Sequence, residues 1–388
     1  MMLDKTVSVR WVQSADAIPA ELWEQCFPPP LEGRWWYAAL EHAGLEDQFT
    51  FSYALLMRGG DAIGIAPAFL MDVPLDIVAP PSLARLLRSL GAWFPRLRYQ
   101  RTLFIGSPCS DEGAVGLAPG VRLRDVTAII QDAANERARA AVASAIVWKD
   151  FPGTAAAELD VLCTERSLFK LVSYPGTIVP RLEGSFEGYL KILNAAKRNS
   201  LKRKLKRSRA MGALDVSVIQ HPDEPLLNEI FNLFWQTYLN GKTSFERLTP
   251  QFFRLIAGED VSHFILLRVP ETGKLAAFML CFHLGDRVIN KFIGLDYAYA
   301  RDWHLYFRLW EEAVDWASKS GATELQSGQT GYMAKLDLGH KLAPLTNYCM
   351  HRNPFIHRLF DFAARYISWS TLDDDLEIYL RAHDADKK

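Results

Sequence analysis

Two stretches of the sequence, residues 49–72 and 263–286, repeat one pattern and limit the folds open to the chain. In each stretch, two runs rich in apolar and aromatic residues flank a short turn. The turn residues are Arg58–Asp61 in the first stretch and Glu271–Gly273 in the second. Two such runs joined by a Gly-containing turn are typical of a β-hairpin. The sequence therefore predicts two hairpins at corresponding places in its two halves.

The residues after each hairpin also correspond. A third strand-like run ends in Phe-Ile-Gly in both halves, at Phe104–Gly106 and at Phe292–Gly294. After a loop, each half continues into a long helical stretch, over residues 121–143 and 304–318. This order predicts a duplicated α/β (α+β) unit, with a mixed, mostly antiparallel sheet flanked by helices in each half. It argues against a doubly wound parallel sheet.

Length, charge and cysteine content narrow the class of protein. A chain of 388 residues, 49% of them hydrophobic, suits two globular domains better than one core. A formal net charge of −1 provides no overall field, so any polyanion must be met by a local cluster. The five cysteines lack metal-binding spacing, and we expect reduced thiols in a cytoplasmic protein without a metal site. The N-terminus does not read as a signal peptide, and no apolar run is long enough to span a membrane.

Proline and glycine gather at residues 175–180, after a short strand-like run, and predict the border between the halves. We predict an N-terminal domain over residues 1–168, a C-terminal domain over 169–350 and a helical tail over 351–388.

The first half carries an extra segment, residues 74–98, between its second and third strands. Its leucines share one helical face and two arginines lie off that face; the residues are Leu83, Leu86, Leu87, Leu90, Arg85 and Arg88. We expect a short helix packed on the domain. The alternatives are a peripheral membrane contact or a roof over an acyl pocket.

Residues 185–219, SFEGYLKILNAAKRNSLKRKLKRSRAMGALDVSVI, combine a Phe-Glu-x-Tyr-Leu phrase, a helix rich in Lys and Arg, and a Gly-led strand. This order resembles CelD-like and FemAB-like members of the GNAT (N-acetyltransferase) superfamily, the type with a BioF-like acetyltransferase domain. The resemblance continues through the second hairpin to SGQTGYMAKLDLGHKL at residues 327–342. It implies tandem GNAT-like folds, of which the second transfers an acyl or aminoacyl group to an amine.

The sequence departs from ordinary acetyl-CoA-dependent members at residues 294–307, GLDYAYARDWHLYF. Those members carry a Gly-rich loop at this place, where backbone N–H groups and the helix dipole hold the CoA pyrophosphate. The missing pattern implies a larger or differently held donor. We therefore expect acyl-CoA, an acyl-carrier protein or aminoacyl-tRNA as co-substrate, and no tightly bound cofactor.

The basic helix at 197–209 holds eight Lys and Arg side chains and no acid. Like charges four residues apart repel, so an anionic partner is expected to compensate them. The candidates for binding donor phosphates are Lys197, Arg198, Lys202 and Arg209. The alternative is a solvated surface helix.

The resemblance singles out Lys335, in a Tyr-x-x-Lys phrase with Tyr332, as the residue beside the reacting carbonyl. An ammonium there would stabilise a developing oxyanion. Acyl transfer to an amine also needs a proton acceptor, for which His304, His340 and Asp296 are candidates. A structural role for each remains the alternative.

The predicted function is that of an N-acyltransferase in which the amine attacks the donor directly. The acceptor would be an amine-bearing small molecule or a cell-wall or polysaccharide precursor. The alternative is a catalytically idle GNAT pair that binds nucleic acid, such as tRNA, or a carrier protein through the basic helix.

Overall fold

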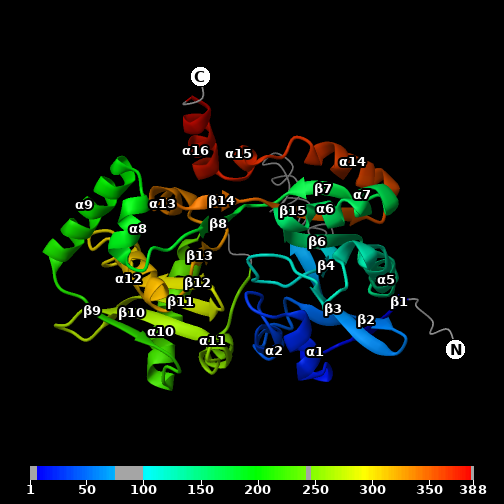
Figure 1. Ribbon diagram of the computed structural model, residues 1–388, viewed down its shortest axis with the longest axis horizontal. Helices are drawn as coiled ribbons and strands as arrows, with labels where there is room; N and C mark the ends of the chain where they lie inside the picture. The colour runs from blue at the N-terminus through cyan, green and yellow to red at the C-terminus, as the bar shows by residue number, and fades with distance from the viewer. Residues whose placement is uncertain (1–6, 75–98, 242–245, 386–388) are drawn as a thin grey trace, which may run out of the picture. The chain divides into compact units, whose positions relative to one another are not determined.

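The computed structural model describes residues 7–74, 99–241 and 246–385, and these form two compact units (Figure 1). The first unit comprises Met1–Pro28, Glu46–Tyr174 and Pro344–Leu372. The second comprises Pro29–Leu45, Pro175–Ala343 and Asp373–Lys388. The units thus divide the chain differently from the ranges 1–168, 169–350 and 351–388, which follow sequence order alone. The segment predicted at 75–98 lies outside the described residues.

The sheet of the first unit has eight strands among the described residues, and its main path runs β1-β2-β3-β4-β6-β15-β7. Neighbours on this path are antiparallel except β4 and β6, which are parallel. The short β5 pairs with β3 off the path. The strands are β1 (Val7–Val12), β2 (Thr50–Arg58), β3 (Asp61–Pro74), β4 (Tyr99–Ile105), β5 (Gly116–Leu117), β6 (Ala145–Pro152), β7 (Phe169–Val172) and β15 (Leu345–His351).

The sheet of the second unit has seven strands among the described residues, in the order β9-β10-β11-β12-β13-β8-β14. Here too every described pair is antiparallel except one, β12 with β13. The order and direction of pairing therefore match the first sheet strand for strand, which confirms the predicted tandem GNAT-like fold. The strands are β8 (Gly176–Val179), β9 (Asp215–Ile219), β10 (Ser262–Arg268), β11 (Leu275–Leu284), β12 (Arg287–Leu295), β13 (Glu324–Ser327) and β14 (Lys341–Ala343).

One strand of each sheet comes from the other half of the sequence. Strand β8 follows β7 of the first sheet after three residues, yet it pairs with β13 and β14 of the second sheet. Strand β15 follows β14 after one residue, yet it pairs with β6 and β7 of the first sheet. The pairing of β15 with the first sheet is one reason why the compact units do not follow sequence order, and the place of Pro29–Leu45 in the second unit is another.

Helices cover both faces of the second sheet. Neighbouring residues of a strand point to opposite faces. Met279 of β11 packs in one core cluster with Leu309, whereas Phe278 contacts Phe253 on the other face. The helices on the Met279 side are α8 (Phe186–Ile192), α9 (Ala195–Met211) and α12 (Leu305–Lys319), and on the Phe278 side α10 (Glu224–Asn240) and α11 (Pro250–Ala257).

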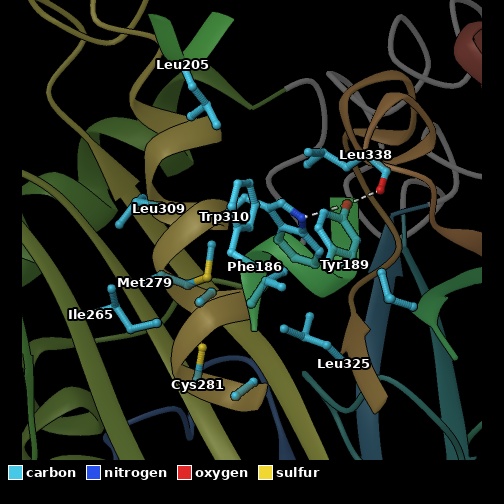
Figure 2. Packing of buried hydrophobic residues seen from close by; sticks show 14 of the residues in the cluster. Phe186, Tyr189, Leu205, Ile265, Met279, Cys281, Leu309, Trp310, Leu325 and Leu338 are labelled. Atoms are coloured by element: carbon cyan, nitrogen blue, oxygen red, sulfur yellow. Dashed lines mark hydrogen bonds between the residues drawn. The ribbon is translucent and has the colours of Figure 1, made fainter. Parts of the chain in front are cut away.

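The core on the Met279 side is built around α12 (Figure 2). Its buried residues recur at helical spacing, so one face of α12 enters the core. Trp310 Nε1 donates a hydrogen bond of 3.1 Å to Tyr189 Oη, and the Tyr189 hydroxyl donates to the carbonyl of Leu338 (Figure 2). These bonds satisfy the buried polar atoms and fix α8 and residue 338 to α12.

The remaining described helices lie outside this core. They are α1 (Ala20–Cys26), α2 (Arg34–Glu41), α5 (Thr127–Ala140), α6 (Ala156–Leu159), α7 (Val161–Glu165), α13 (Tyr332–Asp337), α14 (Pro354–Ala364), α15 (Trp369–Leu372) and α16 (Asp374–Ala385), with 3-10 turns at Ala15–Ala17, Leu123–Asp125 and Gly153–Ala155. All five cysteines are free thiols. Within the described ranges, no helix has the length and apolar character needed to cross a membrane.

Candidate functional site

The parallel strands β12 and β13 of the second unit part before β12 ends. They pair only from Arg287–Glu324 to Asn290–Ser327, and β12 runs on to Leu295 after β13 has stopped. At the last pair, Asn290 Nδ2 donates a 2.9 Å hydrogen bond to Ser327 Oγ. Both side chains are buried, and Asn290 Oδ1 has no hydrogen-bond partner. We call this place, residues 290–295 with 327–328, the strand opening.

The first unit has no such opening at the corresponding place. Strand β4 ends at Ile105, which still pairs with Trp148 of β6. Beyond that pair, Gly113 N–H donates a 2.8 Å hydrogen bond to the carbonyl of Asp150. A Cβ atom on Gly113 would lie 2.0 Å from the Lys149 carbonyl oxygen, so only glycine fits this approach. In the first unit, residues around Gly113 therefore continue along β6 beyond its last pair with β4. In the second unit, no strand among the described residues pairs with the corresponding side of β12 beyond Asn290.

The structure brings Lys335 to the strand opening. Its side chain is buried, 7% exposed, and Nζ donates a 2.6 Å hydrogen bond to the carbonyl of Gly328, the residue after β13. Tyr332, at the start of the same short helix α13, is fully buried and its hydroxyl donates to the Pro175 carbonyl at 2.8 Å. Tyr332 thus anchors α13, and Lys335 places its charge beside the last residues of β13.

His340 lies close to Lys335, in the turn between α13 and β14. Only 2% of it is exposed, its ring centroid lies 4.5 Å from that of Trp310, and neither ring nitrogen has a hydrogen-bond partner. Burial, together with the charges of Lys335 and Lys197, lowers the pKa of His340 well below its usual value. The imidazole is therefore neutral at pH 7, and burial beside two cations opposes its protonation.

A buried ion pair that the sequence analysis did not single out stands at the start of the free stretch of β12. Lys291 has a side chain only 1% exposed, and its Nζ lies 2.7 Å from Glu32 Oε1 and 4.4 Å from the centroid of the Trp36 ring. Buried charges are rare because their desolvation is costly, and they often mark functional sites. The sequence indicates this pair only through two neighbouring polar residues, Asn290 and Lys291, inside a largely apolar strand.

A hollow of about 620 Å³ lies at the start of α12, and Tyr297, Ala300, Arg301, His304, Tyr306 and Phe307 line it. The basic helix α9 borders this hollow: Lys204 Nζ lies 3.9 Å from the centroid of the Phe307 ring. Burial, followed by the charges of Lys204 and Arg207, lowers the pKa of His304. Cations and the positive end of a 15-residue helix therefore meet at one place, which favours an anion.

The four predicted phosphate-binding residues do not meet at this hollow. Arg198 donates to the Leu193 carbonyl at 3.1 Å, and Arg209 pairs with Glu311 at 2.5 Å, so both hold the fold together. Lys202 is exposed, and Lys197 lines a separate hollow of about 370 Å³. Sequence alone showed a helix that is basic on several faces and could not tell which face meets α12.

Asp296 has a structural environment. Its Oδ1 accepts the N–H of Ala298 at 2.9 Å, and its Oδ2 lies 2.6 Å from Lys274 Nζ. These contacts fix the turn that leaves β12. In the part of the chain that the structure describes, no group of three His, Cys, Asp or Glu side chains is arranged to hold a metal ion.

Comparisons with known proteins agree with this architecture. The family model described as "Acetyltransferase (GNAT) domain" matches residues 195–335, which include α9, the strand opening and Lys335. No curated protein matches the sequence.

Among solved structures, FemX shares 12% identity at a TM-score of 0.59, over 91% of this chain and 100% of FemX. The structure of L-PGS from Bacillus licheniformis shares 13% identity at a TM-score of 0.51, over 85% of this chain and 92% of that one. A tandem GNAT protein from the clavulanic acid biosynthesis pathway shares 12% identity at a TM-score of 0.50, over 90% and 99%. At such identities these likenesses concern the fold.

The fold and the family model together define a protein with two acyltransferase-type folds in tandem. Residues 195–335 thus match the GNAT acetyltransferase model, and the chain is similar in fold to FemX, in agreement with the predicted resemblance to FemAB-like members of the GNAT superfamily.

Proposed function

We propose that the second unit transfers an acyl or aminoacyl group from a phosphate-bearing donor to an amine. The observation that carries this proposal is the strand opening, which the first unit fills with its own chain. A reacting carbonyl needs a partly desolvated place with a positive charge nearby, and Lys335 supplies that charge at the opening.

The hollow at the start of α12 is the proposed place for the donor's phosphates. The residues that line this hollow come directly after β12 in the sequence. Lys204, Arg207 and Arg301 provide its positive charge. From there an extended donor arm can run along β12, because a strand edge offers N–H and C=O groups to an added chain. These three cations take the place of the four that the sequence predicted, which are Lys197, Arg198, Lys202 and Arg209.

The proposed chemistry is a direct displacement. The amine nitrogen forms a bond to the carbonyl carbon, and the donor's C–S or C–O ester bond breaks. The charge of Lys335 stabilises the oxyanion that forms in between. The amine's proton passes to the departing thiolate or alkoxide of the donor. Tyr332, Asp296 and His340 keep structural roles, since burial and the charges of Lys335 and Lys197 oppose protonation of the His340 imidazole.

The donor can be an acyl-CoA, an acyl-carrier protein or an aminoacyl-tRNA. Lys202, Arg203 and Lys206 favour the two larger donors, because these exposed cations of α9 make no ion pair within the described residues. Such cations suit a macromolecular anion that extends beyond the hollow. We place the reaction in the cytoplasm, where free thiols persist.

The test is mass spectrometry of products formed from each donor class with a mixture of amines, including amino sugars and amino acids. We expect acyl transfer by the wild-type chain with at least one donor class and a large loss in Lys335→Met. Exposed Lys341, close by on β14, supplies the matched control Lys341→Met. Binding of tRNA or carrier protein through α9 without transfer would favour the idle pair instead.

A further inference from the structure

Helix α14 of the first unit is apolar on two opposite faces. One face packs on the sheet: His357 contacts the Phe169 ring at 5.2 Å between centroids, and Ala364 is buried in a cluster with Phe169 and Cys349. In Figure 1 this orange helix lies over β7 and β15. This inner face accounts for how α14 is held in place.

The outer face of α14 carries a stripe of large apolar side chains. Phe355, Leu359 and Phe362 recur at intervals of four and three residues, and Tyr366 continues the stripe just after the helix. Phe355 is 79% exposed and Tyr366 68%, and more than half of Leu359 and Phe362 is exposed. A stripe of this kind on a helix already anchored by its other face needs an apolar partner.

Basic side chains border the stripe on one side. At 100° per residue, Arg358 and Arg365 fall beside Phe362 and away from the packed face. Arg365 pairs with Asp361 at 3.1 Å, whereas Arg358 is exposed and makes no ion pair or side-chain hydrogen bond among the described residues. Aromatic and leucine side chains flanked by arginine match a lipid surface, where the rings enter the headgroup region and the guanidinium groups meet phosphates.

We propose that α14 docks the protein on the surface of an anionic lipid bilayer. The 11-residue helix would lie in the plane of the surface, with Phe355, Leu359 and Phe362 inserted and Arg358 at the phosphates. Anionic lipid headgroups offer phosphates to Arg358, which has no anionic partner among the described residues, next to an apolar layer for the stripe. This proposal does not depend on the proposed acyl transfer.

The test is flotation of the full chain with vesicles of phosphatidylcholine alone and of phosphatidylcholine mixed equally with phosphatidylglycerol. We expect binding to the mixed vesicles and about a tenfold or greater loss of affinity in the double variant Phe355→Ser, Phe362→Ser. The matched control replaces two exposed apolar residues on other helices, Leu239→Ser with Ile378→Ser, and should bind like wild type. Both pairs are exposed, so folding should be retained.

The charge is tested separately with Arg358→Glu. We expect about a tenfold loss of affinity for the mixed vesicles and little change on phosphatidylcholine alone, because the arginine acts on anionic headgroups. The proposal is wrong if wild type fails to bind the mixed vesicles, or if the double variant binds as well as wild type. The latter result would place any binding elsewhere, for instance in residues 74–98. Sedimentation that shows a dimer lost in the double variant, without vesicle binding, would assign the stripe to a second copy.

Discussion

Replacing Lys335 by methionine removes the positive charge at the strand opening and keeps most of the side-chain volume. Lys335 is 7% exposed, so its charge acts in a medium of low polarity. An ammonium about 4 Å from an oxyanion contributes about 4 kcal/mol at an effective dielectric constant of about 20. Loss of one oxyanion donor lowers kcat by about 10²- to 10³-fold. We therefore expect a fall of this size in kcat, with KM nearly unchanged.

The fold should tolerate this change. The Gly328 carbonyl that Lys335 contacts also has Thr177 Oγ1 at 3.4 Å. The loss of a hydrogen bond from a charged group is expected to change the free energy of unfolding by no more than about 3 kcal/mol, because burial of the charge is also relieved. Circular dichroism and thermal unfolding of Lys335→Met and Lys341→Met would check this.

A second measurement on Lys335→Met, the pKa of His340, distinguishes a catalytic role of the lysine charge from a role in packing. Lys335 lowers the pKa of His340, so its removal should raise that pKa, which NMR titration of the imidazole protons can measure. A folded Lys335→Met variant with a raised His340 pKa but a kcat within about threefold of wild type would refute the assigned role.

Three further outcomes follow from the site. Lys204→Met combined with Arg207→Met should raise the KM for the donor about tenfold or more, as measured by steady-state kinetics, whereas exposed Lys341→Met should not. Equal effects would exclude the hollow as the phosphate site. The pKa of His304 should rise when the donor binds, because an anion favours the charged imidazole; an unchanged NMR titration curve would contradict this. His340 stays neutral in the fold but takes a proton in the unfolded chain below about pH 6.5, so the free energy of unfolding should fall there by up to about 1.4 kcal/mol per pH unit from this residue alone. Urea unfolding of His340→Phe should show a smaller pH dependence, and an identical one would show that His340 titrates normally.

The repeated hairpins were predictable because local residue patterns determine them. Turn residues and β-rich runs at 49–72 and 263–286 lie next to each other in the sequence, and the structure pairs β2 with β3 and β10 with β11. The exchange of β8 and β15 was not predictable in this way. β8 has four residues and β15 has seven, and their partner strands lie far away in the sequence, so long-range packing selects the sheet that each joins.

One part of the candidate site, Lys335, was predictable because a single sequence motif contains it. Lys335 was singled out by its motif, and the structure brings it to the strand opening. The pairing of Glu32 with Lys291 was not found, because 259 residues separate them and the resemblance gave Lys291 no role. Lys204 was not preferred over Lys197, because α9 is basic along several faces and the face that meets α12 is set by tertiary packing.

Hydrogen–deuterium exchange with and without the donor found in the transfer experiment would show whether the donor binds along β12. We expect bound donor to slow exchange in residues 291–307 of the second unit and to leave residues 102–113 of the first unit unchanged. Among the described residues, the strand opening of the second unit lies in sequence just before the cationic hollow, whereas Gly113 bonds to Asp150 in the first. Protection of 102–113, with none at 291–307, would place the donor in the first unit and exclude the strand opening as its site.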